Sequence, residues 1–431
     1  MEFYHHCHNG VFPYKPTNIH LIVDRNEGSL ERIWKKFHVF VQSLFSQLDI
    51  SNTIPNDPSY PFLTAARASH QRVLDEIINY IKNSTQQPPL TNTEWQNFFD
   101  SDGRLTDFDH IKNRIYHSGV EASLLPDVIP FIFGLHKSDS TSSERNDINL
   151  QLDHEFDVLL RQTKSYQPQQ VSNNKKMYAA FRVIHHDILR TDRQLSAFKK
   201  ENGIGLKILT DLLRTYTIYN PPIGYLQGMN DLFVPILLAF IPKWDESSSP
   251  VTENGYEQYL PRIFWSFDSM LQHLHHMKML NDIATECEKM TGVVFSILSE
   301  VSPLASIWLR KNNLQNLLWM YSDFVLLFKR SFDDVWSVWT KLSTSPDPPN
   351  WFSYFTAAIL ILIFNEIGTL EEITTPVIMD SFSKFMAKLN VDDIGLAAMY
   401  LYERFKVPKK KEEKNKNVKK EFKYFKPEWN K

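Results

Sequence analysis

Apolar side chains recur at steps of three and four residues along most of this chain, which is the spacing of one face of an α-helix. Aliphatic and aromatic residues follow this spacing over residues 33–48, 73–81, 177–188 and 206–216. No run of alternating apolar and polar residues is long enough to predict a β-sheet. Only 13 of the 431 residues are glycine, which also favours long helices. The pattern therefore predicts an all-α protein.

Breaks in this pattern predict where the central helices begin and end. The helix over 177–188 should stop near residue 190, and the next should stop at 220–222 (Asn-Pro-Pro), because a residue before proline disfavours the helical conformation. A further helix should follow Gly228, and another should run over about 317–339. Two short polar segments thus lie at helix ends.

Polar stretches divide the chain into three parts. We expect an N-terminal region with amphipathic helices over residues 1–88, a helical domain over 89–405, and a tail over 406–431. The first boundary falls in the polar run NSTQQPPLTNTE, which has the composition of a linker. Within the domain, the polar insertions at 138–147 and 245–255 should be surface loops.

The tail differs in charge from the rest of the chain. Residues 406–431 contain 11 lysines and 4 glutamates, a net charge of +7, whereas the whole chain carries −3. One interpretation is a solvated, disordered segment with a helical tendency. The other is a basic segment that makes weak peripheral contact with anionic lipid.

Charge and cysteine content narrow the class of protein. A net charge of −3 provides no global positive field for binding nucleic acid. The two cysteines, Cys7 and Cys287, provide no disulfide framework and favour a reducing compartment. The first 16 residues lack the charged and apolar regions of a secretory signal. We therefore expect a cytoplasmic protein.

One apolar segment, WFSYFTAAILILIFNEI at 351–367, allows two interpretations. It is shorter than the roughly 20 apolar residues that a membrane span needs, and polar residues interrupt it. We expect a buried core helix rather than a transmembrane one.

Histidines cluster at 5–8, together with Cys7, and at 273–276. The first cluster has ligand-type residues but lies next to the terminus, and the second places two histidines side by side, poorly arranged for one metal ion. We therefore expect surface or amphipathic-face histidines rather than a metal site. The sequence also contains no phosphate-binding G-x-x-x-x-G-K-[ST] loop, G-x-S-x-G motif or H-E-x-x-H motif. The chain therefore shows no nucleotide site of its own.

The first polar segment is IHHDILRT, from Ile184 to Thr191. Asp187 and Arg190 lie three residues apart, so on a helix they share a face and can hold one another. An arginine near a helix C-terminus also interacts favourably with the helix dipole, with no further function. Spacing alone leaves both interpretations open.

The second polar segment is YLQGMND, from Tyr225 to Asp231, which follows the Pro-Pro turn. Gly228 permits a close approach of the backbone, and Asn230 or Asp231 is a candidate cap of the following helix. Gln227 then lies at a helix entrance, where its amide can face outward. A glutamine beside a glycine at a turn also occurs without any function.

Together, IxxDxxRT and YxQGMxDL resemble the two signature motifs of the TBC domain, the helical GTPase-activating module for Rab proteins. Residues 89–124 resemble the entry to this domain in the yeast Gyp-seven-like branch and its animal relatives. FKRSF at 328–332, followed by Trp336 and Trp339, is similar to FKREF and its following tryptophan in that branch. The resemblance covers about residues 89–405.

The resemblance implies a GTPase-activating protein whose partner is a GTP-bound Rab-family small GTPase. It assigns Arg190 as an arginine finger, which stabilises charge on the transferred phosphoryl group, and Gln227 as a glutamine finger, which orients the attacking water. It implies supporting or orienting roles for Ile184, Asp187, Thr191, Tyr225, Gly228, Met229, Asn230 and Asp231. GTP and magnesium belong to the partner, so the chain needs no cofactor. Vesicle trafficking is the implied process, in the cytoplasm or peripherally on endomembranes.

The sequence departs from the family pattern at three places, one of which is the loop over 245–255, which resembles an insertion. Leu125 and Ile129 stand where the family usually has arginine and tryptophan, and Ser322 and Asp323 replace an Arg-Trp pair. These positions belong to the scaffold rather than to the fingers. The main alternative is a catalytically silent TBC scaffold that binds a GTPase or an effector, and a third is a helical adaptor with coincidental motifs. Both fingers are present, which favours activity.

Overall fold

The computed structural model describes residues 61–405 except 85–86 and 369–373. The helix predicted over 33–48, the histidines at 5–8 and the basic tail lie outside the described residues. In the described part, α-helices are joined by loops and 3-10 turns, and pairing between extended residues is limited to three isolated bridges. The all-α prediction is confirmed.

The helices of the N-terminal half are α2 (Pro61–Asn83), α3 (Asn92–Gln96), α4 (Phe108–Ser118), α5 (Leu125–Ile132), α6 (Ser142–Ser165), α7 (Pro168–Asn173), α8 (Lys175–Ile188), α9 (Ile204–Tyr219) and α10 (Met229–Phe240). Those of the C-terminal half are α11 (Leu260–His273), α12 (His276–Asn281), α13 (Ile283–Val301), α14 (Pro303–Lys311), α15 (Tyr321–Leu326), α16 (Val335–Thr344), α17 (Pro348–Ile367), α18 (Thr375–Met386) and α19 (Val391–Arg404). Short 3-10 turns, η2 to η5, lie at 122–124, 196–198, 257–259 and 318–320.

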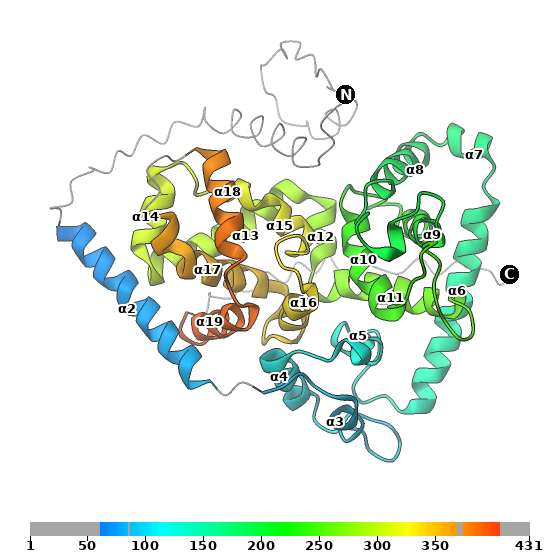
Figure 1. Ribbon diagram of the computed structural model, residues 1–431, viewed down its shortest axis with the longest axis horizontal. Helices are drawn as coiled ribbons and strands as arrows, with labels where there is room; N and C mark the ends of the chain where they lie inside the picture. Colours follow the sequence, from blue (N-terminus) through cyan, green and yellow to red (C-terminus); the bar gives the residue numbers. More distant parts are fainter. Residues whose placement is uncertain (1–60, 85–86, 369–373, 406–431) are drawn as a thin grey trace, which may run out of the picture. The chain divides into compact units, whose positions relative to one another are not determined.

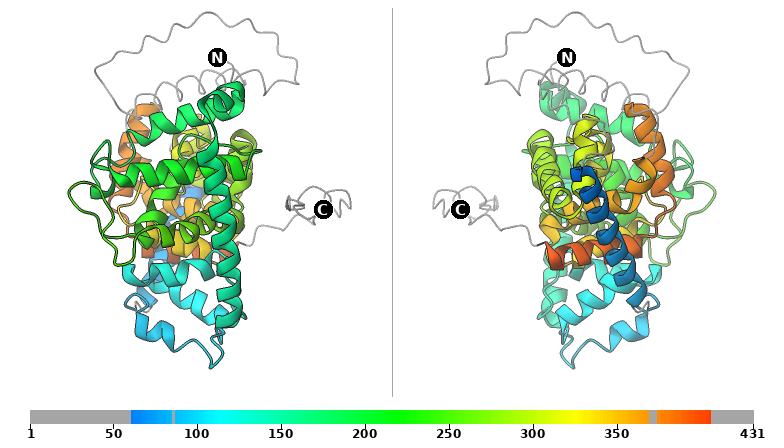
Figure 2. Two further views of the ribbon diagram at one scale, coloured as in Figure 1. Left: turned by 90° about the vertical axis from the view of Figure 1, so that its right-hand side faces the viewer. Right: turned by 90° about the vertical axis from the view of Figure 1, so that its left-hand side faces the viewer.

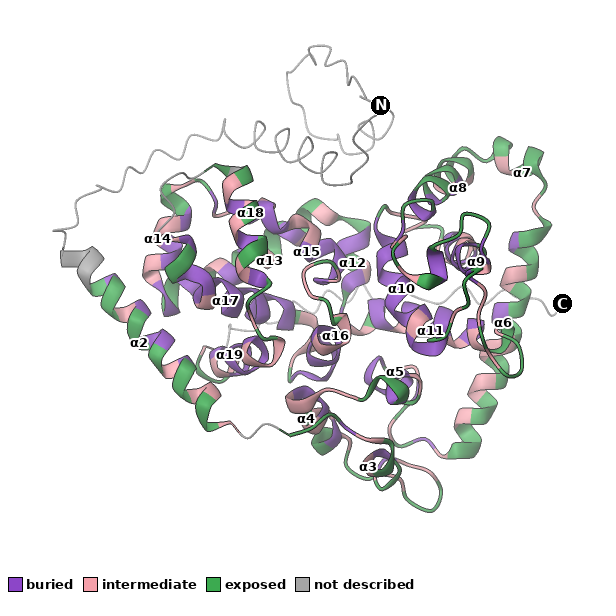
Figure 3. Ribbon diagram, viewed as in Figure 1, coloured by how far each residue is buried: buried purple, intermediate pink, exposed green. Residues whose placement is uncertain are grey.

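Helix α17 lies at the centre of the C-terminal half, where it packs against α13, α18 and α19 (Figure 1). Most of its side chains are buried, as the purple ribbon in Figure 3 shows. By length and composition α17 could cross a membrane. A helix that is apolar on all sides is equally typical of the core of a large domain, and the burial agrees with that interpretation.

Helix α2 covers one side of this half and contacts α13, α14 and α19. In Figure 2 it crosses in front of the yellow-green helices when the left-hand side of Figure 1 faces the viewer. Its apolar stripe, Val73, Leu74 and Ile77, is buried in the core. His70 extends the contact, because its Nδ1 lies 2.7 Å from Ser302 Oγ. The predicted domain boundary at 88/89 stays a prediction, but the helix before it packs on the helices after it.

The two polar segments, 184–191 and 225–231, lie in the N-terminal half, which is built around α9. Helices α6 and α8 both pack on α9, and α10 packs on α11 and α9. The left view of Figure 2 shows the long α6 running beside these helices. Helices α8 and α9 end near the predicted positions, with α9 ending at Tyr219, just before the Pro-Pro turn, and α10 begins after Gly228 as predicted.

The prediction of one helix over 317–339 is wrong. Helix α15 ends at Leu326 and α16 begins at Val335, because Leu327 and Phe328 adopt left-handed backbone conformations with φ of 49° and 60°. Trp339 Nε1 donates a hydrogen bond of 2.9 Å to the Leu327 carbonyl, which fixes this break from within the core. Apolar spacing continues through the break, so the pattern alone could not reveal it.

The prediction of a surface loop is wrong for 142–147 and correct for 245–255. Helix α6 starts inside the first predicted loop, at Ser142, where Thr141 and Glu144 form a capping box. The second, 245–255, is a loop as predicted. One of its residues, Ser248, is nevertheless buried, and its Oγ donates a 2.6 Å hydrogen bond to the Ser196 carbonyl.

Candidate functional site

Helix α8 carries the first motif on its C-terminal end. Phe181, Ile184 and Ile188 form its buried face, while the opposite face is exposed. Ile184 is therefore a core residue beneath the motif. The chain leaves the helix at Leu189, so the Arg190 side chain projects from the turn that follows and is 36% exposed.

Arg190 is held by Asp187, as predicted from their spacing. Its Nη2 donates to Asp187 Oδ1 at 2.6 Å, and the Asp187 side chain is only 3% exposed. A guanidinium has five N–H donors, so this contact leaves others available for an anion outside the protein. The ion pair thus restrains the arginine without using up its hydrogen-bonding capacity.

The second motif forms the turn that leads into α10. Gly228 has φ of 103°, and a Cβ there would lie 2.8 Å from Leu326 Cδ2. The backbone conformation therefore favours glycine, and any side chain here would also displace the end of the Leu326 side chain of α15. Gln227, the residue before it, is exposed, while Met229 is buried beneath the turn.

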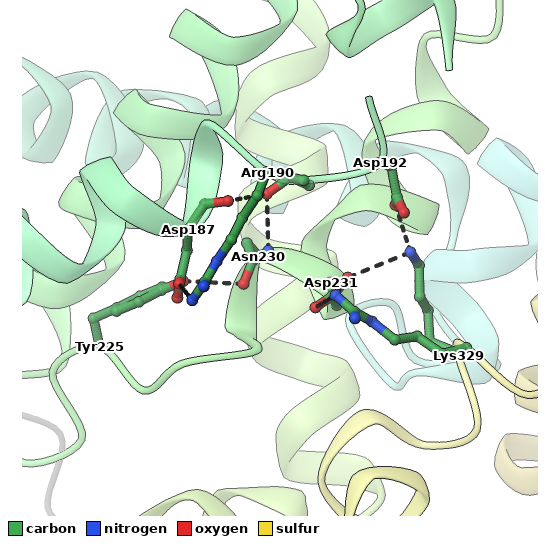
Figure 4. Close-up of polar contacts among 9 residues, drawn as sticks. Asp187, Arg190, Asp192, Tyr225, Asn230, Asp231 and Lys329 are labelled. Atoms are coloured by element: carbon green, nitrogen blue, oxygen red, sulfur yellow. Dashed lines mark hydrogen bonds and ion pairs between the residues drawn. The ribbon is translucent and has the colours of Figure 1, made fainter. Parts of the chain in front are cut away.

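The structure brings the two motifs together through Asp187 and Thr191 (Figure 4). Tyr225 Oη donates to Asp187 Oδ2 at 2.7 Å and lies 3.0 Å from the Asn230 amide oxygen. Asn230 Nδ2 donates to Thr191 Oγ1 at 2.9 Å, and Thr191 Oγ1 donates to the Asp187 carbonyl at 2.8 Å. The turn that carries Gln227 is therefore tied to the helix end that carries Arg190.

The charge state of Tyr225 follows from its surroundings. Burial, together with the negative charge of Asp187, raises the pKa of Tyr225 well above its usual value. The hydroxyl therefore keeps its proton and remains a donor to the carboxylate at physiological pH.

The predicted cap of α10 by Asn230 or Asp231 is wrong. Gly228 occupies the N-cap position, and no side chain caps this helix end. Asn230 instead bonds to Thr191, as described above. Asp231 accepts hydrogen bonds from Arg330 Nη2 at 2.9 and 2.7 Å. Both side chains thus connect segments distant in sequence, which a local pattern cannot reveal.

Three further charged residues belong to this site and were not predicted as site residues. Lys329 Nζ forms ion pairs with Asp192 Oδ2 and, at 3.4 Å, with Asp231 Oδ1 (Figure 4). Arg330 completes the group through Asp231. Lys329 and Arg330 lie within the FKRSF segment, whose similarity to the family's FKREF was the available signal.

His273 and His276, of the second histidine cluster, lie against backbone carbonyls. His273 Nε2 lies 2.8 Å from the Ser343 carbonyl, and His276 Nε2 lies 2.9 Å from the Val325 carbonyl. Burial lowers the pKa of His276 to about 4, so its ring is neutral at physiological pH. Among the described residues, no group of three or more His, Cys, Asp or Glu side chains is placed to hold a metal ion.

The residues that depart from the family pattern lie in the scaffold. Leu125 and Ile129 are buried in α5, which packs on α10 and α16. Asp323 is buried in α15 and accepts a hydrogen bond from Ser331 Oγ. Burial raises the pKa of Asp323 to about 6.

Comparisons with known proteins identify a family and several relatives. A family model described as Rab-GTPase-TBC domain matches residues 135–366. TBC1 domain family member 17 of Homo sapiens is 27% identical over 323 residues, which is 73% of this chain and 46% of that protein. GTPase-activating protein gyp7 of Schizosaccharomyces pombe is 23% identical over 93% of this chain and 54% of that protein. The chain thus spans about half the length of these two relatives.

A solved structure shows the same fold. The crystal structure of the Ypt/Rab-GAP domain of Gyp1p aligns with a TM-score of 0.59 and 13% identity, over 76% of this chain and 98% of that chain. At this identity the similarity concerns the helical architecture alone.

Proposed function

This chain belongs to the Rab-GTPase-TBC domain family, and from that premise we propose that it accelerates GTP hydrolysis by a Rab-type small GTPase. The relatives place it in the Gyp-seven-like branch, as its motifs predicted. Its partner would be the GTP-bound Rab, whose own GTP and magnesium complete the reacting centre. This chain would contribute only side chains.

One observation carries the proposal: Arg190 and Gln227 are both exposed, on two segments that Asp187 and Tyr225 tie together. A cation and an amide on two linked segments are two groups that an activating protein can supply to phosphoryl transfer. The cation stabilises the charge that develops on the phosphoryl oxygens, and the amide orients the attacking water. Neither role needs a proton transfer, because a guanidinium stays charged and an amide does not titrate.

The remaining motif residues would act through these two. Asp187 fixes the direction of Arg190, and Tyr225 transmits the position of the Gln227 turn to that carboxylate. Gly228 lets the turn lie against Leu326. The buried Leu125 and Ile129 fill the core on the side of α5, so these departures from the family pattern leave the site's supports in place.

The proposal is tested by single-turnover GTP hydrolysis across a panel of Rab proteins. We expect at least one Rab to respond, and Arg190→Ala to reduce the accelerated rate by about 10³-fold or more. Arg190→Lys should restore little, because a lysine offers a point charge where arginine offers a planar fork. A lysine variant that keeps most of the activity would contradict the arginine assignment.

The glutamine assignment has its own test. A Rab whose switch glutamine is changed to leucine should still be hydrolysed, because Gln227 would supply the missing amide. Gln227→Ala should then abolish turnover while a pull-down still recovers the GTP-bound Rab, since one amide contributes little to a whole interface. If the altered Rab resists the wild-type protein although the normal Rab responds, Gln227 does not have this role. If several Rabs bind and none is hydrolysed, the protein is a silent scaffold.

We place this activity in the cytoplasm, with peripheral contact to endomembranes through the basic tail. The basic tail and the small number of cysteines support this placement, and binding to acidic liposomes tests the membrane contact.

A further inference from the structure

Lys329 joins the two functional segments from the side opposite to Tyr225. Its Nζ pairs with Asp192, two residues beyond Arg190, and lies 3.4 Å from Oδ1 of Asp231, four residues beyond Gln227. All three side chains are largely withdrawn from solvent, with exposures of 11% for Lys329, 13% for Asp192 and 3% for Asp231. One ammonium group therefore holds Asp192, which follows the first motif, and Asp231, which lies within the second motif (Figure 4).

The residues on either side of Lys329 pack against the core. Phe328 stacks on Phe352 of the central helix α17, with ring centroids 4.7 Å apart and planes 14° apart. Ser331 Oγ donates to the buried Asp323, and Trp339 Nε1 donates to the Leu327 carbonyl. The left-handed residues on the N-terminal side of Lys329 are thus held by contacts with the core, while Lys329 itself is also held by its contacts with the two segments.

Asp192 and Asp231 differ in how many cations they contact. Asp231 has a second partner in Arg330, whereas Lys329 is the only cation that the described residues place against Asp192. Leaving a largely buried carboxylate without a partner costs free energy, so the ion pair with Lys329 fixes the position of Asp192. The segment following Arg190 is therefore located by the same atom that locates the start of α10.

We propose that Lys329 is a positioning residue that sets the separation of Arg190 and Gln227 for the reaction. The proposal rests on the proposed function for its effect on rate, but not for its effect on structure. Lys329 would not touch the nucleotide. It would act by keeping the helix end and the turn in the arrangement that the transition state needs, where a displacement of about 1 Å can cost on the order of 10²-fold in rate.

A variant series separates positioning from simple stabilisation. Lys329→Met removes the ammonium and leaves Asp192 unpaired, so it should lower both stability and rate. In the double variant Lys329→Met with Asp192→Asn, no unpaired charge remains, and Asp231 keeps Arg330. Asparagine also tolerates the positive φ of 37° at position 192. The double variant should therefore recover thermal stability without recovering the link between the segments.

The matched control is Arg114→Met. Arg114 is 10% exposed and pairs with Glu94, at 2.7 Å, in the α3–α4 region rather than beside either motif. The substitution Arg114→Met should lower thermal stability without affecting the segments that hold Arg190 and Gln227.

The first measurement is hydrogen–deuterium exchange of the free full-length protein. Lys329→Met and the double variant should both exchange about tenfold faster at residues 189–195 and 225–232, while Arg114→Met leaves these segments unchanged. Unchanged protection in both Lys329 variants, or protection regained in the double variant, would overturn the proposal. This measurement needs no partner, so it decides the positioning role even if no Rab responds to the wild-type protein.

The second measurement is the single-turnover rate on a responding Rab at increasing protein concentration. Both Lys329 variants should lower the rate at saturation by about 10- to 100-fold and leave the half-saturating concentration within about threefold. Arg114→Met should change neither. If the double variant regains the wild-type rate, Lys329 acts only by neutralising Asp192, and the proposal is wrong. If no Rab responds to the wild-type protein, the proposed function fails, and the exchange result stands by itself.

Discussion

Asp187 receives hydrogen bonds from both sides of the candidate site, from Arg190 at Oδ1 and from Tyr225 at Oδ2. A carboxylate that is 3% exposed needs such donors, because its own hydration has been removed. The same requirement that stabilises the fold therefore fixes the direction of the arginine. At this site, stability and geometry depend on the same contacts.

Tyr225→Phe tests this dependence at a single oxygen. We expect the variant to lose about 1.5–3 kcal/mol of unfolding free energy, because a hydrogen bond to a charged group is removed. We also expect a rate at saturation about tenfold lower, because the Gln227 turn loses its link to Asp187. Denaturant unfolding and single-turnover hydrolysis measure the two effects. Tyr178→Phe, at an exposed position on α8, is the control for stability and should change it by less than about 0.5 kcal/mol.

Asp323 makes a pH-dependent contribution to stability. Burial raises its pKa to about 6 from the usual 3.8, so the folded state favours the protonated carboxyl. The contribution is fully present below the unfolded-state pKa and is lost as the pH rises through about 6. Asp323→Asn should therefore gain stability relative to wild type between pH 4 and pH 7, by up to about 3 kcal/mol at 1.36 kcal/mol per pKa unit. Unfolding curves at the two pH values test this, and a difference that does not change with pH would contradict it.

At the scale of elements, α2 is a helix outside the motifs that contributes to the core of the C-terminal half. It packs on α13, α14 and α19, and α13 and α19 in turn pack on the central α17. Two adjacent residues of α2 provide a matched pair, since Ile77 is fully buried and Ile78 is 36% exposed.

Ile77→Ala should lower the free energy of unfolding by about 2–5 kcal/mol, because it opens a cavity between α2 and the core. Ile78→Ala should stay within about 0.5 kcal/mol of wild type. Thermal and denaturant unfolding distinguish the two. Equal effects of the two substitutions would mean that α2 does not pack as described. Hydrolysis by the folded fraction should be unchanged in both, because neither residue lies near the motifs.

At the scale of the whole molecule, the charge distribution separates the tail from the domain. Residues 406–431 carry +7 in a chain of net charge −3. Near an anionic membrane each lysine can contribute about 1 kcal/mol, an attraction that salt screens. We expect the full chain to cosediment weakly with acidic liposomes at low salt, and less at high salt.

Deleting residues 406–431 should remove this binding and leave hydrolysis in solution unchanged. Neutral phosphatidylcholine liposomes are the control and should bind neither form. Equal binding with and without the tail would assign the membrane contact to another part of the chain.

The sequence by itself determined those features that depend on neighbouring residues. Periodicity located α8 and α9, because each of these helices buries an apolar face whatever its partner, and Gly228 marked the start of α10. The Asp187–Arg190 contact was predictable for the same reason, since three residues along a helix return a side chain to the same face. Local spacing is therefore sufficient to identify both motifs as candidates.

Only the tertiary structure decided how these candidates are held. Asp192 and Lys329 are 137 residues apart, and Asp231 and Lys329 are 98 apart, so no local rule pairs them. The same holds for Asn230, whose amide is as suited to capping a helix as to binding Thr191. The break between α15 and α16 has apolar residues in left-handed conformations, which the packing of Phe328 and Trp339 stabilises and local propensity opposes. Local spacing makes a residue available for a contact, and the packing of distant segments selects which contact it makes.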